Sequence, residues 1–265
     1  MLLPALAKAK QKALIASCLS SEKQLALAWS MYCDDNNEKV INFDTKTSGS
    51  HPDIPWRYEW SHLPFPFTPS AGSLQVQRTA QILEGYKQGG LYKYAPNGAV
   101  IHCPGDSRYK LAPTSLTANG PFAFGSVSGV ECLNGEKATT SPAGDTTHIF
   151  KRTALRHPSD KILWMEENDS RGENEGSWEF NEGSGPSGNY SGAAFIDSPA
   201  VFHGSSSSFN FADSHAASRR WLDGATIVYA ASTDPNKYGS TRPNLTSAPR
   251  DTAFVARGYA MPDNP

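Results

Sequence analysis

The first 35 residues constrain the fold most, because they read as one uninterrupted helix. No Gly or Pro occurs from Ala5 to Asp34, and most residues there are good or tolerable helix formers. Apolar side chains recur on one side at helical spacing, namely Leu14, Cys18, Leu25, Trp29 and Tyr32. A helix of about 30 residues is about 45 Å long. That length exceeds the width of a small domain, so we expect one end to project.

The N-terminal end is the one that we expect to project. It begins with the apolar residues Met1, Leu2, Leu3 and Leu6. Lysines follow at positions 8, 10 and 12, and an apolar run followed by lysines is typical of the end of a membrane-inserted helix. An amphipathic helix whose first turn caps a core fits the same residues. No segment of the sequence reaches the roughly 18 consecutive apolar residues that span a bilayer.

Composition limits the classes of function. The chain has 265 residues and a formal net charge of -2, so no general field attracts nucleic acid or an anionic membrane surface. Only 38% of the residues are hydrophobic, while there are 22 Gly and 19 Pro. These proportions predict a modest core wrapped in many loops.

Beyond the first helix, short elements are expected. Gly89 and Gly90 end a predicted helix over Arg78–Lys87. Apolar or alternating runs predict strands at Ala99–Cys103, Phe122–Val127, Lys161–Glu166, Ala200–His203, Ser207–Asp213 and His215–Trp221. A tight turn is expected at Asp213-Ser214. A helix that buries one stripe on a small antiparallel sheet, with long loop insertions, gives an α+β fold.

The four cysteines, Cys18, Cys33, Cys103 and Cys132, include no C-x-x-C pair. A zinc ribbon or a thioredoxin-type site is therefore not expected. In an exported chain they can pair with three connectivities, and we favour Cys103 with Cys132 because both lie in the loop-rich middle. The alternative is four unpaired thiols.

The best polar cluster lies at the predicted strand ends and consists of Glu166, Glu167, His203, Asp213 and His215. Two histidines and a carboxylate can hold a transition metal, and carboxylates with loop carbonyls can hold Ca²⁺. A structural role is the alternative. In that role Asp213 hydrogen-bonds the backbone at a turn and His203 bridges strand ends.

No motif predicts an enzyme. The sequence "GSVSG" at 125–129 matches G-x-S-x-G, with Ser128 as a nominal nucleophile and His148 and His157 downstream. That motif needs a strand, a sharp turn and a helix, whereas the residues that follow here are not helical in character. Neither G-x-x-x-x-G-K-[ST] nor H-E-x-x-H occurs.

Several segments resemble one family. "MLLPALAKAKQKA…CLSSEKQLALAWSMYCDDNN" is similar to the segment that follows the hydrophobic stretch in prepilin-like proteins, the type II secretion pseudopilins and their relatives. "GGLYKYAPNGAVIHCPGDSRY" and "RHPSDKILWMEEN" resemble further segments of that family. "HGSSSSFNFADSHAASRRW" resembles its prepilin-type processing-associated signature, a His, nine residues and Asp-Gly (the H-X9-DG motif). Here His203 and Asp213 match, but Ser214 replaces the Gly. The resemblance spans residues 1 to about 222.

The resemblance implies a pilin-like fold, with an N-terminal pilin helix over 1–35 and a globular head over 36–265. It implies a non-catalytic structural subunit of a type II secretion pseudopilus or type IV pilus-like filament. The expected partners are other pseudopilin subunits, inner-membrane secretion components and the membrane itself, reached through an apolar segment upstream. The family lies in the inner membrane and the periplasm or at the cell surface, while the chain printed here is expected to be soluble. The resemblance implies no cofactor, although some secretion pseudopilins bind Ca²⁺.

An alternative function is a surface-exposed glycan- or protein-binding module anchored by the same helix. Trp56, Tyr58 and Trp60 alternate along one segment, so they can present an aromatic platform for a sugar. Such aromatics can equally anchor a loop in the core.

Overall fold

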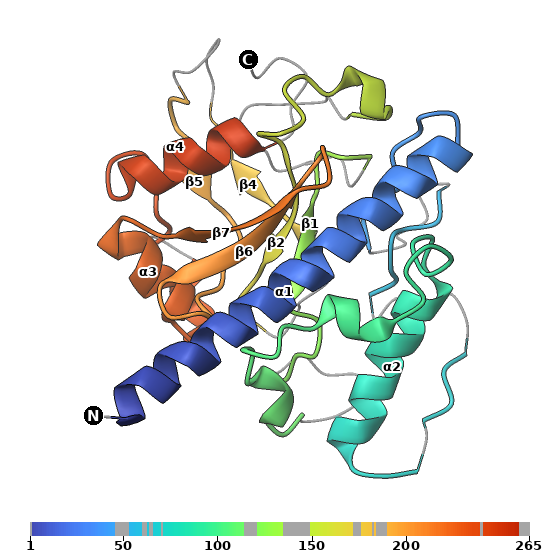
Figure 1. Ribbon diagram of the computed structural model, residues 1–265, viewed down its shortest axis with the longest axis horizontal. Coiled ribbons are helices and arrows are strands. Elements are labelled where there is room, and N and C mark those ends of the chain that lie inside the picture. Colours follow the sequence, from blue (N-terminus) through green and yellow to red (C-terminus); the bar gives the residue numbers. More distant parts are fainter. Residues whose placement is uncertain are drawn as a thin grey trace.

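A long helix crosses one face of a small sheet in the computed structural model (Figure 1). The structure describes residues 2–45, 53–59, 63, 66–69, 71–113, 121–134, 149–171, 176–181, 183, 190–238 and 241–259. Helix α1 (Leu2–Asp35) packs against strands β6 (Ser206–Phe211) and β7 (Ala216–Arg220). The predicted combination of a long N-terminal helix and a small sheet is therefore confirmed at the level of an α+β fold.

The main sheet has five strands in the order β3-β1-β2-β6-β7. Its other strands are β1 (Val127–Val130), β2 (Ile162–Glu166) and β3 (Ser177–Trp178). Neighbouring strands pair antiparallel except β3, which pairs parallel with β1. The sheet is therefore mixed, whereas the sequence predicted an antiparallel sheet. A second, two-stranded sheet joins β4 (Phe180–Asn181) to β5 (Ala194–Phe195).

The β6–β7 hairpin forms where the sequence predicts a tight turn. Ser214 adopts a positive φ of 71°, and its N–H donates to the carbonyl of Phe211 at 2.8 Å. The predicted strands at Ala99–Cys103 and Ala200–His203 are wrong. The first is a 3-10 turn, Gly98–Ile101, because the Asn97 side chain accepts the N–H of Ala99 at its start. The second is an irregular segment and a turn.

The described residues form three further α-helices: α2 (Leu74–Gln88), α3 (Gly224–Ala231) and α4 (Pro249–Gly258). The α2 helix was expected over a shorter range, whereas α3 and α4 were not predicted. Side chains alternate between the two faces of a strand. Asn210 on β6 contacts Glu22 of α1, while its neighbour Phe209 contacts Phe254 of α4. The sheet therefore lies between α1 and α4.

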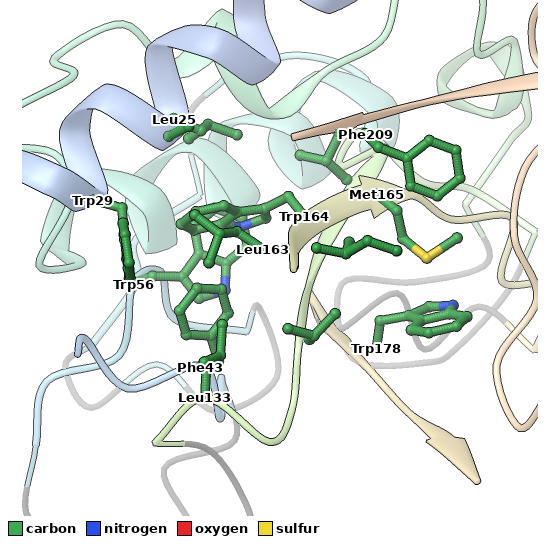
Figure 2. Close-up of a cluster of buried hydrophobic side chains, with 14 of the residues drawn as sticks. Leu25, Trp29, Phe43, Trp56, Leu133, Leu163, Trp164, Met165, Trp178 and Phe209 are labelled. Atoms are coloured by element: carbon green, nitrogen blue, oxygen red, sulfur yellow. The ribbon is translucent and has the colours of Figure 1, made fainter. Parts of the chain in front are cut away.

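Aromatic side chains fill the core (Figure 2). Trp164 on β2 packs with Trp56 at a ring-centroid distance of 5.5 Å and with Phe43 at 4.6 Å. Trp56 is fully buried, so it anchors its segment in the core rather than presenting a platform to a sugar. That part of the platform prediction is wrong, and Trp60 lies outside the described residues.

Burial changes along α1. The described side chains from Ala5 to Ala13 are exposed, and Leu6 is 68% exposed. Burial begins at Cys18 and is complete at Leu25 and Trp29. In Figure 1 the N-terminal end of the helix extends past the sheet. The C-terminal half of α1 thus belongs to the core, while its first turns project.

Of the residues predicted to serve assembly, Met1, Leu2, Leu3 and Leu6, the structure describes the side chain of Leu6 alone. Met1 lies outside the described residues, and Leu2 and Leu3 are helical without described side chains. Within the described part of the chain, no helix combines the length and the apolar character that crossing a bilayer requires.

Candidate functional site

Four buried side chains from four separate segments meet beneath α1. They are Cys18 of α1, Cys103 in the loop after Gly98–Ile101, Glu166 at the end of β2, and His203 in the turn before β6. One ligand atom from each lies within 4.8 Å of the others. We call this set the Cys-Glu-His cluster.

His203 is the centre of the cluster. Its Nε2 lies 2.9 Å from Glu166 Oε1 and 3.3 Å from Cys103 Sγ. Cys103 Sγ in turn lies 2.8 Å from Cys18 Sγ. The four donor atoms therefore converge on one point, although their residues are far apart in the sequence.

Backbone groups orient Glu166 and Cys103. The N–H of Ser208 on β6 donates to Glu166 Oε2 at 2.9 Å, which leaves Oε1 directed at the cluster. The N–H of Gly105 donates to Cys103 Sγ at 3.3 Å. A Cβ at Gly105 would lie 2.9 Å from the carbonyl oxygen of Phe202 and 3.2 Å from His203 Cε1. Gly105 therefore permits the close approach of the Cys103 turn to His203.

The "CPGD" segment is fixed by a buried ion pair. Arg108 Nη2 donates to Asp106 Oδ2 at 2.8 Å and to the carbonyl oxygen of Glu167 at 2.9 Å. The backbone N–H of Arg108 also donates to Asp106 Oδ1 at 2.9 Å. Because the same turn carries Cys103, this pair fixes the thiol relative to the end of β2.

Burial and hydrogen bonding oppose each other at His203. Burial lowers the pKa of His203, but hydrogen bonds with Cys103 and Glu166, together with the charge of Glu166, outweigh it and raise the pKa to about 10. The hydrogen bond with Cys18 and then burial raise the pKa of Cys103 well above its usual range. These directions favour a neutral thiol at Cys103 and a protonated imidazole at His203. His203 Nδ1 is buried without a hydrogen-bond partner among the described residues.

A second buried carboxyl lies one helical turn from Cys18. Burial, followed by the nearby charge of Glu166, raises the pKa of Glu22 well above its usual value, while the hydrogen bond from Ser208 lowers it. Asn210 Nδ2 donates to Glu22 Oε2 at 2.9 Å and to the carbonyl oxygen of Glu22. These contacts attach α1 to β6 beside the Cys-Glu-His cluster.

Only part of the predicted polar cluster comes together. Glu166 and His203 are in contact, but Glu167 accepts a hydrogen bond from Ser128 instead. Consecutive strand residues point to opposite faces, so Glu166 and Glu167 cannot share one site. Asp213 and His215 pair with each other at 2.6 Å on the exposed hairpin. The five residues therefore do not form one metal site.

The predicted disulfide between Cys103 and Cys132 is not formed. Cys103 contacts Cys18 across 85 residues of sequence. The stripe of α1 predicted that Cys18 is buried, but nothing in its local spacing identifies the partner. The sequence did contain one sign that Cys18 has a partner: it is a cysteine on the side of the helix that is predicted to be buried.

The two ends of the predicted signature have different positions in the structure. His203 lies in the buried cluster, and Asp213 and Ser214 form the hairpin turn, where Asp213 Oδ1 accepts the N–H of His215 at 3.1 Å. The residues between them include the whole of β6. The motif spacing therefore equals one strand with its two connections.

The residues of the nominal nucleophile motif do not form a catalytic arrangement within the described part of the chain. Ser128 is buried in β1, and its Oγ donates to Glu167. The chain continues from β1 into a turn rather than a helix. His157 is exposed in another turn, and His148 lies outside the described residues.

Comparisons with protein-family models, with curated proteins and with solved structures find no match for this chain.

Proposed function

We propose that the chain is a non-catalytic structural subunit of a type II secretion pseudopilus or type IV pilus-like filament, with a pilin-like fold. The observation that carries this proposal is the change in burial along α1. Buried residues of α1 begin at Cys18, whereas Leu6 is 68% exposed and its described neighbours up to Ala13 are exposed as well. A helix that served only the core would have no use for these exposed turns.

The exposed turns are suited to packing against another helix. Ala5, Ala9 and Ala13 recur every four residues and are exposed together with Leu6. Small residues in an i, i+4 row form a shallow groove that admits the ridge of a neighbouring helix. Burial of this surface between subunits would supply the force for assembly.

The second half of α1 would hold the globular head on the helix that packs in the filament. Buried contacts between Glu22 and Asn210 join the helix to β6, and Arg152 binds the C-terminal end of α1 through Ser30 Oγ at 2.9 Å and Asp34 at 2.6 Å. A helix fixed to the sheet in this way would carry the head on the outside of a filament. The partners would be other pseudopilin subunits and inner-membrane secretion components, at the inner membrane and in the periplasm or at the cell surface.

Site-specific photo-crosslinking tests this proposal. A photoreactive residue replaces Leu6 in the protein as its own cell makes it, and a matched variant carries it at Val228, which is 72% exposed on α3. We expect position 6 to crosslink to another copy or to another pilin-type subunit, and position 228 not to. Absence of crosslinks at position 6, or equal crosslinking at both positions, would refute assembly through α1.

A further inference from the structure

The geometry points to the Cys-Glu-His cluster as a closed, structural zinc site. This inference does not depend on the proposed function, because it rests only on the four donor atoms and their surroundings. Cys18, Cys103, Glu166 and His203 supply two sulfurs, one carboxylate oxygen and one imidazole nitrogen. Four ligands of these kinds complete the tetrahedral coordination of a structural Zn²⁺ site.

The spacing of the donor atoms fits one ion after a small expansion. Zinc binds sulfur at about 2.3 Å and nitrogen or oxygen at about 2.0–2.2 Å, so tetrahedral donors lie about 3.3–3.8 Å apart. The donors of the cluster lie within 4.8 Å of one another, and their contacts measure 2.8 Å between the sulfurs and 2.9–3.3 Å at His203. An ion at the centre would require the close contacts to lengthen by about 1 Å or less.

Neighbouring backbone groups already orient two of the four donors as the outer contacts of a metal site do. The Ser208 N–H occupies Glu166 Oε2, so Oε1 is the oxygen available to an ion. The Gly105 N–H donates to Cys103 Sγ, and such a hydrogen bond stabilises the thiolate that a metal needs. On binding, each of the two thiols would lose its proton to solvent while its sulfur bonds the ion, and His203 would lose the proton of Nε2 so that this nitrogen can bind.

The donor set selects the kind of ion. Thiolate and imidazole favour zinc and related transition metals, whereas Ca²⁺ and Mg²⁺ take oxygen ligands. All four side chains are buried, so no coordination position faces solvent for a substrate or a catalytic water. The role that follows is structural, because the ion would join α1, the Cys103 turn, β2 and the His203 turn.

A disulfide between Cys18 and Cys103 is the competing use of the two sulfurs. It would involve only half of the cluster and would leave the convergence of Glu166 and His203 on the same point without a role. A zinc site requires all four residues as ligands, whereas a disulfide requires only the two cysteines. The test therefore includes variants of His203 and Glu166 as well as of the cysteines.

The test is metal analysis of the full chain, purified with its thiols reduced and dialysed against zinc and then against metal-free buffer. We expect about one zinc ion per chain in the wild type and only traces in Cys18→Ser, Cys103→Ser and His203→Ala. Cys33→Ser is the matched control, because Cys33 is a buried thiol of the same helix outside the cluster. It should bind as much zinc as the wild type.

Cobalt substitution keeps the test informative if a variant folds poorly. Co²⁺ bound to the wild type and to Cys33→Ser should give a thiolate-to-cobalt charge-transfer band and the strong visible bands of tetrahedral cobalt. Glu166→Gln, which preserves the shape of the side chain, should weaken Co²⁺ binding at least tenfold while the circular dichroism stays unchanged. A wild type that binds no zinc, a cobalt spectrum without thiolate bands, or peptide mapping that finds Cys18 bonded to Cys103 in the protein from its own cell would each overturn the inference.

Discussion

Asp223 and Asp251 each accept a hydrogen bond from the backbone N–H of the other. Asp223 N donates to Asp251 Oδ2 at 2.8 Å, and Asp251 N donates to Asp223 Oδ2 at 2.9 Å. Asp223 also accepts the N–H of Arg250 at 2.8 Å. The residue before α4, Ala248, has no side chain that can cap the helix, so Asp223 satisfies the N-terminal donors of α4 from a distance. This exchange joins α3 to α4 at the side of the sheet opposite α1.

We predict that this pair of hydrogen bonds makes part of the free energy of unfolding depend on pH. Burial raises the pKa of Asp223, but hydrogen bonds from the N–H of Asp251 and from Arg250 outweigh it and lower the pKa. The unfolded chain therefore binds the proton more readily, near pH 4. The stabilisation is complete above about pH 4 and is lost as the pH falls through the lower pKa of the folded state.

Replacement of Asp223 by Ala measures that contribution. At neutral pH we expect Asp223→Ala to lower the free energy of unfolding by about 1–2 kcal/mol, as the loss of a helix cap does. In urea titrations at decreasing pH, the difference from the wild type should shrink below about pH 4. A difference that stays constant down to pH 2 would contradict this account.

Ser214 allows a second prediction, because it adopts a backbone conformation at the hairpin turn that favours glycine. Its φ of 71° lies in the left-handed region, which costs a residue with a Cβ about 1–2 kcal/mol. Glycine avoids most of that cost but loses about 0.5–1 kcal/mol of unfolded-state entropy. The Ser214 hydroxyl makes one long contact of 3.4 Å to the carbonyl oxygen of Ala26.

Two variants separate the effect of backbone strain at position 214 from the effect of the Ser214 hydroxyl on stability. Ser214→Ala removes only the hydroxyl, and Ser214→Gly also removes the Cβ. We expect the Gly variant to be more stable than the Ala variant by up to about 1 kcal/mol, measured by thermal or urea unfolding. An Ala variant as stable as the Gly variant would mean that the turn does not strain its residue.

Gly129 and Gly224 form a matched pair for a third prediction. A Cβ at Gly129 in β1 would meet the ring of Phe43 at 2.0 Å, whereas a Cβ at Gly224 in α3 would meet nothing within 4 Å. Overpacking of a dense core costs about 1–3 kcal/mol or more, while Gly→Ala is favourable by about 1 kcal/mol inside a helix and by less at Gly224, the first residue of α3. Gly129→Ala should therefore lower the melting temperature, and Gly224→Ala should preserve or raise it. Equal effects from the two substitutions would show that Phe43 moves aside without cost.

The parts of the fold that the sequence predicted are those with a regular pattern. The buried side of α1 follows a helical period through Leu25 and Trp29, and β6 and β7 alternate around a recognisable turn at Ser214. The two-residue strands, such as Ser177–Trp178, are too short to show any period. Their pairing depends on tertiary contacts, so local sequence carries little information about them.

The candidate site shows the same division. Glu166 and His203 were predicted to approach because each was placed at a strand end, although the strand predicted at Ala200–His203 is an irregular segment and a turn. The pleat excludes Glu167 from that face, and the same rule applied to the sequence would have removed it from the cluster. Cys18 joins from a helix that lies 85 residues before Cys103. That contact depends on how α1 packs against the sheet and against the Gly98–Ile101 turn, and no spacing within either segment encodes it.

The change in burial along α1 gives the last prediction. Leu6 is 68% exposed and Leu25 is fully buried against the sheet, although both are leucines of one helix. Truncation of a buried leucine to alanine costs about 2–5 kcal/mol, whereas an exposed substitution changes stability by about 0.5 kcal/mol or less. In urea unfolding of the isolated chain, Leu25→Ala should therefore be strongly destabilising and Leu6→Ala nearly neutral. A comparable loss in Leu6→Ala would show that the first turns of α1 fold back onto the head, and α1 would then have no free surface for another subunit.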